Sequence, residues 1–223
     1  MRAFATPTTI STVLDIPAGQ IRLIAADRTD TTVEVRPLDS SKSRDVKAAE
    51  QIGVAYADGV LRIEAAPAKN RVLGHSGSVE ITVQLPAGSR IEAKAASAEL
   101  RGVGRLGDVT FEAAHATVKL DETAGARLTL QAGDVSIGRL GSAAQIRTQK
   151  GDITISEAHH GTVALRTEFG DLQVGAARGT SASLDARTTF GSVRNSLDNA
   201  DGPAAALTIH ATTAFGDITA RSL

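Results

Sequence analysis

The sequence repeats one five-residue pattern at Gly133-Asp134-Val135-Ser136-Ile137, at Gly151-Asp152-Ile153-Thr154-Ile155 and at Gly170-Asp171-Leu172-Gln173-Val174. Each copy has a glycine, an aspartate and two apolar residues separated by one other residue. The regular return of a strand-forming segment is typical of a solenoid, whose repeats bury their apolar faces only by stacking on one another. The pattern therefore predicts a β-solenoid.

The same period continues on both sides of these copies. An apolar residue two positions after the glycine position marks each repeat, at Leu100, Val118, Val135, Ile153, Leu172, Val193 and Ile218. The markers predict about seven coils of about 18 residues. Before each marker lies a strand of opposite phase, so the chain is expected to turn at the glycine while both strands keep apolar residues inward.

The expected architecture is all-β, with a parallel β-helix and an N-terminal β cap. We favour a right-handed helix, because parallel crossovers in a sheet are overwhelmingly right-handed. The alternatives are a left-handed solenoid and a flattened, two-sided one. We divide the chain into a cap region at residues 1–88 and the repeats at residues 89–223, joined as one continuous structural unit.

The cap region is expected to contain strands without a tight repeat. Residues 20–26 and 31–36 alternate around a turn and predict a hairpin or consecutive strands of one sheet. A second pair of strands surrounds the turn signal Asp58-Gly59, and residues 40–50 hold one short helix at most. Residues 67–78 are expected to form a loop before the strand at 79–85.

Composition narrows the range of partners and locations. The chain has 24 basic and 25 acidic residues, which gives no electrostatic footprint for nucleic acid or for an anionic membrane. It has no cysteine, and no run of about 18 apolar residues that could insert into a membrane. The first residues lack the apolar core of a signal peptide, so we expect a soluble, cytoplasmic protein.

These features resemble a known family. The Gly-Asp-[Val/Ile] repeats, together with a strand that closes on Leu85-Pro86-Ala87-Gly88, are similar to the bacterial β-strand-repeat proteins called putative adhesins. The resemblance covers residues 14–219. It implies a repeat fold and no reaction. Members of that family are often attached to membranes or associated with envelope-stress operons, and we expect this chain to differ from the attached members in having no anchor.

Two ladders of polar side chains are expected along the stack. Asp134, Asp152, Asp171 and Asp217 form one column, with Ser192 in place of the carboxylate in one coil. This column could hold calcium, but it lacks the glycine density of calcium-binding repeats, so we expect each aspartate to bind local backbone N–H groups. A second column contains Thr148, Thr167, Thr188 and Thr213, whose hydroxyls can bond along the stack.

The histidines give no metal site. They lie at His75, His115, His159, His160 and His210, and His159 and His160 should point apart on an extended chain. We therefore expect surface histidines, no bound metal and no cofactor.

A third column changes character along the chain. The residue before the corner glycine is Lys150 in one repeat and phenylalanine at Phe169, Phe190 and Phe215. A column that accepts lysine is not deeply buried, so the three rings could form an exposed ladder for a partner; alternatively, they could seal a widening core.

No acid, base, nucleophile or phosphate-binding loop converges in the sequence. We therefore expect a non-enzymatic scaffold that binds a protein partner or forms a weak homodimer through its C-terminal coils. The alternative is a carbohydrate-binding module or an enzyme that uses a groove on the solenoid face. The expected structural turns are Gly133-Asp134, Gly151-Asp152, Gly170-Asp171 and Gly216-Asp217.

Overall fold

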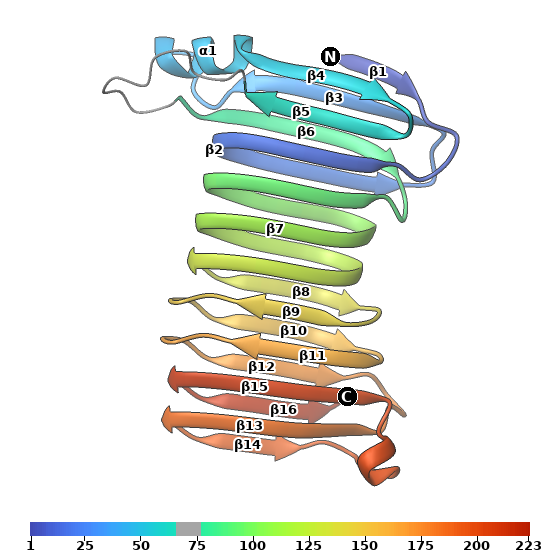
Figure 1. The fold of residues 1–223 in the computed structure, drawn as a ribbon, viewed down its shortest axis with the longest axis vertical. Coiled ribbons are helices and arrows are strands. Elements are labelled where there is room, and N and C mark those ends of the chain that lie inside the picture. The colour runs from blue at the N-terminus through green and yellow to red at the C-terminus, as the bar shows by residue number, and fades with distance from the viewer. Residues whose placement is uncertain (66–76) are drawn as a thin grey trace.

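The protein is an elongated all-β stack with one short α-helix (Figure 1). The computed structural model describes residues 1–65 and 77–223, so most of the loop expected at residues 67–78 lies outside the described residues. The strands join one sheet of 16 strands that is not closed.

The elements of the first half are β1 (Arg2–Ala5), β2 (Ser11–Ala26), β3 (Asp30–Pro37), α1 (Ser43–Glu50), β4 (Ile52–Ala57), β5 (Val60–Ala65), β6 (Val79–Pro86) and β7 (Arg90–Ala132). The elements of the second half are β8 (Val135–Leu140), β9 (Ala144–Arg147), β10 (Ile153–Ala158), β11 (Gly161–Arg166), β12 (Leu172–Ala176), β13 (Ala182–Phe190), β14 (Val193–Ser196), a 3₁₀ turn η1 (Gly202–Ala204), β15 (Leu207–Phe215) and β16 (Ile218–Ser222).

Alternation of apolar and polar residues creates the core. In β6, Val79, Ile81, Val83 and Leu85 are completely buried, whereas the intervening residues are partly exposed. Side chains of a strand point to opposite faces in turn, so one face of every strand lines a narrow interior. The core therefore runs along the whole length of the stack as one continuous cluster.

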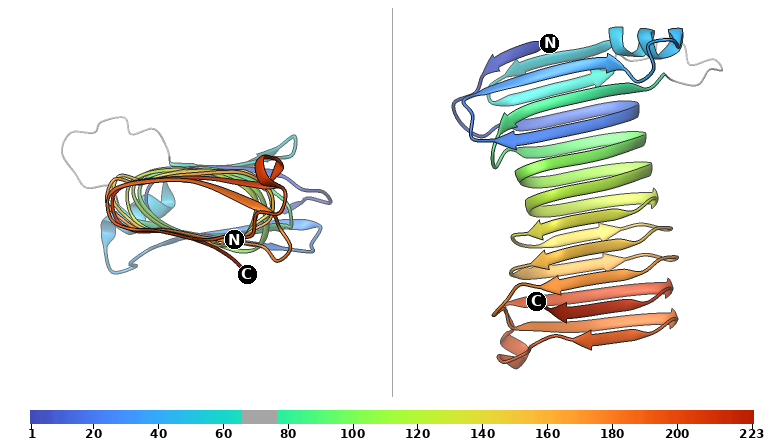
Figure 2. Two further views of the ribbon diagram at one scale, coloured as in Figure 1. Left: turned by 90° about the horizontal axis from the view of Figure 1, so that it is seen from below. Right: turned by 180° about the vertical axis from the view of Figure 1, so that it is seen from behind.

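The stack has two faces formed by parallel strands. The C-terminal part of β7 is followed on one face by β9, β11, β15 and β13, and on the other face by β8, β10, β12, β16 and β14. Seen along its long axis, the chain traces a flattened oval (Figure 2). The shape is therefore that of the flattened, two-sided solenoid given above as an alternative. The handedness of the solenoid and the number of its coils stay predictions.

The C-terminal coils are not stacked in the order of the sequence. β15 pairs with both β11 and β13, and β16 pairs with both β12 and β14. The last coil in the chain therefore lies between two earlier coils, as the labels in Figure 1 show. Stacking of the coils in the order of the sequence, as in a simple solenoid, therefore does not hold at this end.

The N-terminal part has the same kind of insertion. β2 pairs in parallel with β7 over most of its length, and its two halves pair on the other side with β5 and β6. A strand of the cap region therefore pairs with a strand of the repeat region, across the boundary proposed between residues 88 and 89. The division into these two regions stays a prediction.

Antiparallel strands close the N-terminal end. β4 and β5 form the hairpin expected around Asp58-Gly59, and both turn residues have positive φ. The hairpin considered for β2 and β3 is wrong, because β3 pairs with β1 and β6 instead. The rings of Phe4 and Tyr56 pack together 5.5 Å apart, and the short helix that was expected between residues 40 and 50 packs against β3 and β6. The end of the core is covered there.

Glycine is required at the Gly-Asp corners for two reasons. Gly151 has a φ of 140°, and a Cβ added to it would overlap the carbonyl oxygen of Gly133 in the neighbouring coil. The earlier corners in β7 have no such glycine, and β7 winds through them as one continuous strand (Figure 1). In the repeats from Leu100 on, the expectation that glycine makes every turn therefore holds only from Gly133 onward, and in the N-terminal part Gly19 of β2 has the same conformation, with a φ of 142°.

We predict that Gly151→Ala lowers the free energy of unfolding by about 3 kcal/mol or more, because the new methyl group meets backbone that cannot move aside. Gly179→Ala is the matched control: Gly179 has a φ of 74° and open space around its Cα, so only the dihedral cost of about 1 kcal/mol remains. Urea denaturation measures both values. Equal losses in the two variants would contradict the role of stacking at Gly151.

Candidate functional site

The aspartates of the corners form a continuous ladder between coils. The Asp134 carboxylate accepts a hydrogen bond from the backbone N–H of Asp152 at 2.9 Å, and Asp152 accepts one from Asp171 at 2.8 Å. Asp171 accepts from Asp217, which in turn accepts from the N–H of Ser192, both at 2.8 Å. Each side chain thus bonds the neighbouring coil. The expectation of bonds within the local turn is wrong.

Ser192 lies at the end of this ladder. Because the last coil of the chain is inserted before it, the four aspartates are adjacent and the column has no break. The charge-stabilised bond at its end lowers the pKa of Asp217 below the usual 3.8, mainly through the backbone N–H of Ser192 and then through the Ser192 hydroxyl.

The threonine column completes the corners. Thr167 and Thr213 are buried, and their hydroxyls donate to the carbonyl oxygens of Gly151 and Gly170, each at 3.1 Å. The acceptors are thus corner carbonyls of the adjacent coil and not other threonines. Hydrogen bonds of the threonine hydroxyls along the stack were expected, but backbone carbonyl groups were not expected as their acceptors.

The three phenylalanines form a stacked, exposed column on the same corner. The ring centroids of Phe169 and Phe215 are 5.0 Å apart and those of Phe215 and Phe190 are 4.8 Å apart, with the ring planes 3° and 9° from parallel. Phe169, Phe215 and Phe190 are 50%, 45% and 62% exposed. A role in sealing the core is therefore wrong. We call these residues the phenylalanine ladder.

The spatial order of the phenylalanine ladder differs from its order in the sequence. Phe215 lies between the other two rings because β15 is inserted between β11 and β13. Ring faces are largely occupied by neighbouring rings, and the edges are open to solvent. Val193, at the start of β14, is a further exposed apolar side chain of the terminal coil.

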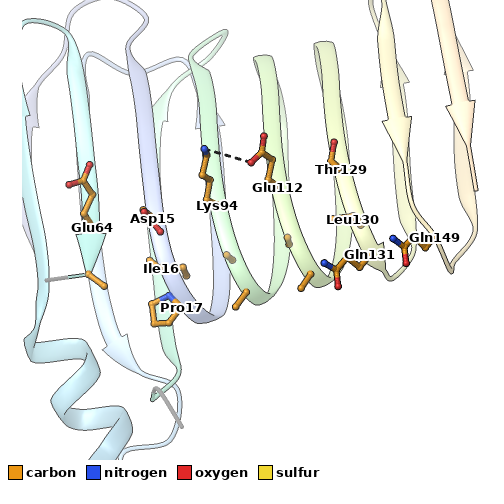
Figure 3. A pocket seen from close by; sticks show the side chains of 15 residues that line it. Asp15, Ile16, Pro17, Glu64, Lys94, Glu112, Thr129, Leu130, Gln131 and Gln149 are labelled. Atoms are coloured by element: carbon orange, nitrogen blue, oxygen red, sulfur yellow. Dashed lines mark ion pairs between the residues drawn. The ribbon is translucent and has the colours of Figure 1, made fainter. Parts of the chain in front are cut away.

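A groove of about 1170 Å³ runs beside the same corner in the N-terminal half. Alanines and Ile16 form its apolar floor, and Glu64, Asp15, Lys94 and Glu112 stand along it on neighbouring strands (Figure 3). Lys94 and Glu112 form an ion pair at 3.6 Å. The groove has an acidic surplus, and Asp15 lies directly opposite Glu64 on the neighbouring strand.

The histidines within the described residues do not converge. His159 lies 3.4 Å from Glu157 and His210 lies 3.6 Å from Asp185. In residues 1–65 and 77–223, no group of three His, Cys, Asp or Glu side chains is placed to hold a metal ion. Within the same ranges, no helix has the length and apolar character needed to cross a lipid bilayer.

One column of charged residues was missed in the sequence analysis. Arg147 lies directly opposite Arg166 on the neighbouring strand, and Thr212 lies between Arg166 and Arg187. All three arginines are exposed. The sequence did contain a signal, because each of these arginines directly precedes a residue of the threonine column.

We predict that Asp152→Ala lowers the free energy of unfolding by about 1 kcal/mol, because the N–H of Asp171 loses its acceptor in the neighbouring coil. Asp152→Asn should cost less, since an amide oxygen can still accept that bond. Asp201→Ala, outside the ladder, serves as the control. Chemical denaturation of the three variants decides, and an Asp152→Ala protein as stable as the control would argue against the ladder.

The lowered pKa of Asp217 predicts a dependence of stability on pH. A carboxylate with a folded-state pKa below its unfolded value stabilises the fold above the unfolded pKa, and this contribution is lost as pH falls through the folded pKa. The native protein should therefore melt above Asp217→Asn at pH 7, and the difference should shrink below about pH 4. A difference that stays constant from pH 7 to pH 2 would contradict this assignment.

The solved structures that match this chain come from several bacteria. The chain is 12% identical to a putative cell adhesion protein of Clostridium sporogenes, with a TM-score of 0.40, covering 100% of this chain and 98% of the other. It is 18% identical to a putative adhesin of Bacteroides fragilis, with a TM-score of 0.47, covering 98% of this chain and 95% of the other. It is 15% identical to a putative adhesin of Parabacteroides distasonis, with a TM-score of 0.43, covering 100% of this chain and 95% of the other.

The comparison with curated proteins finds no match. A family does match nearly the whole chain, from residue 11 to residue 222. The matched region begins with β2, the inserted N-terminal strand, and reaches the end of β16, so it includes all the coils described above. The chain belongs to the Toastrack DUF4097 family.

Proposed function

We propose that this protein is a non-enzymatic interaction scaffold of the adhesin-like β-solenoid type, which self-associates weakly through its C-terminal coils. The observation that carries the proposal is the phenylalanine ladder, an apolar strip held open to solvent by a rigid corner. As part of the same proposal, the solenoid is right-handed with about seven coils.

The energetics favour covering this strip. Each of the three rings leaves about half of its surface in water, and burial of apolar surface contributes about 25 cal/mol per Å². Association also costs translational and rotational freedom, so a patch of three rings supports only a weak complex. A two-fold dimer is the simplest closed arrangement of identical chains.

The two ends of the stack differ in a way that supports this location. Antiparallel strands and the Phe4–Tyr56 pair cover the N-terminal end. At the other end, β13 and β14 each pair with one neighbour, and all residues of β14 are exposed. Residues 197–206 cover only part of this edge, where the carbonyl of Asp198 accepts the N–H of Ala182 at 2.9 Å.

The carbohydrate-binding or enzymatic alternative rests on the groove of Figure 3. No observation on that groove favours a reaction, so we do not propose an activity for it. A cytoplasmic location stays a prediction.

Sedimentation at increasing protein concentration tests the dimer. We expect a weight-average mass that rises with concentration for the native chain and stays at the monomer value for Phe215→Asp, because a carboxylate in the middle of the ladder resists burial. Leu38→Asp is a matched control, since Leu38 is exposed to 44% and lies at the opposite end of the stack. A strictly monomeric native chain, or a dimer unaffected by Phe215→Asp, would refute the proposed interface.

A further inference from the structure

The charges in one column of side chains on one face are segregated along the length of the stack. The column that contains the arginines continues toward the N-terminal end through Thr129, Glu112 and Lys94 to Asp15 and Glu64, the side chains aligned in Figure 3. The N-terminal half of this column has three acidic residues and one lysine. The C-terminal half has arginines and threonines only. A net charge of −1 for the whole chain conceals this division.

The arginines are not neutralised by neighbours. Strands pack about 4.8 Å apart, and like charges directly opposite each other on neighbouring strands are destabilising. Arg147 and Arg166 hold this arrangement, and among residues 1–65 and 77–223 neither forms an ion pair. Arg187 is partly compensated by Asp185 at 3.7 Å. An anion bound between Arg147 and Arg166 would relieve their repulsion.

Neutral hydrogen-bonding groups flank the two arginines along their column, and the nearest charged residues beside the column are Arg127, opposite Gln145, and the exposed Glu168, two residues after Arg166. Thr129 and Thr212 precede and follow them in the same column, and Gln145 is two residues before Arg147 on the same face of β9. Guanidinium groups bind carboxylates and sulfates with two parallel hydrogen bonds, and the hydroxyls and amide can bond neutral oxygens beside them. The surface thus offers both charged and uncharged contacts in a line.

We propose that the face around Arg147 and Arg166 binds an acidic polysaccharide, whose carboxylate or sulfate groups pair with the arginines and whose hydroxyls bond the flanking threonines and Gln145. This inference is independent of the phenylalanine ladder.

Two other polyanions fit this surface less well. An extended peptide places side chains of one face about 6.6 Å apart, which does not match the strand spacing. The backbone groups in the middle of the sheet are already paired, so such a peptide could not bind as an added strand. A flat anionic membrane would also meet the acidic half of the same face at Asp15, Glu64 and Glu112.

The experiment measures binding of the full chain to heparin, a sulfated chain, and to polygalacturonate, a carboxylated one, at about 0.1 M salt, where exposed charges still interact within about 10 Å. We expect binding to both, weakened at least about tenfold in the double variant Arg147→Gln/Arg166→Gln. The matched control, Arg194→Gln/Arg221→Gln, removes the same charge from β14 and β16 on the opposite face of the stack and should bind like the native chain. Neutral dextran should not bind.

A second measurement separates binding from folding. Because Arg147→Gln/Arg166→Gln removes a like-charge contact, its melting temperature should equal or exceed that of the native chain. The inference is overturned if neither glycan binds, if both double variants lose affinity equally, or if the weakened variant also melts lower. Equal or tighter binding to polyglutamate would assign the face to an acidic polypeptide, and binding to phosphatidylserine vesicles would assign it to a membrane; either result would also overturn it.

Discussion

Contact of backbone with backbone at the Gly-Asp corners is the constraint on which the rest of the repeat region depends. The N–H of Gly151 donates to Phe169 in the next coil at 2.8 Å, and its carbonyl accepts the hydroxyl of Thr167. The adjacent aspartate receives the next N–H of the stack. A corner with no free space and no free donor fixes the position of the coil above it, because any shift would break all three contacts at once.

The alignment of successive coils at the corner determines which side chains lie next to one another on the surface. Once the corners are aligned, residues at equal distances from them fall into straight columns, and one residue type repeated along the sequence becomes a line of identical groups in space. The phenylalanine ladder is one position before the corner glycines, and the arginines are four positions before them. Both surfaces therefore follow from the same structural requirement, although their chemistry is opposite.

Much of this arrangement could be predicted from the sequence, and the missing parts have a common cause. The Gly-Asp pattern identified the corners, the inward phase of the strands and the members of each column, because those depend on local geometry and period. The order of coils was missed, since a repeat can pair with any other repeat of the same shape. For the same reason, the order of residues in the sequence puts Ser192 within the aspartate column and Phe190 between Phe169 and Phe215, whereas in space Ser192 ends its column and Phe215 is the middle ring. The Arg147 and Arg166 surface was missed because the total charge was considered without its distribution over columns.

The inserted coil formed by β15 and β16 affects how the chain can be assembled. A solenoid stacked in sequence order can grow by adding each new repeat to the last one, but here β13 and β14 reach their final place only when a later segment fills the space before them. Non-local pairing of this kind must pay the entropy of loop closure before it gains contacts. Loss of β15 and β16, the last strands in the sequence, would not shorten the stack at its end. It would separate β13 and β14, which lie at the end of the stack, from all the other coils. The number of repeats in this protein is thus tied to its topology, and evolution cannot change it by simple deletion at the C-terminal side.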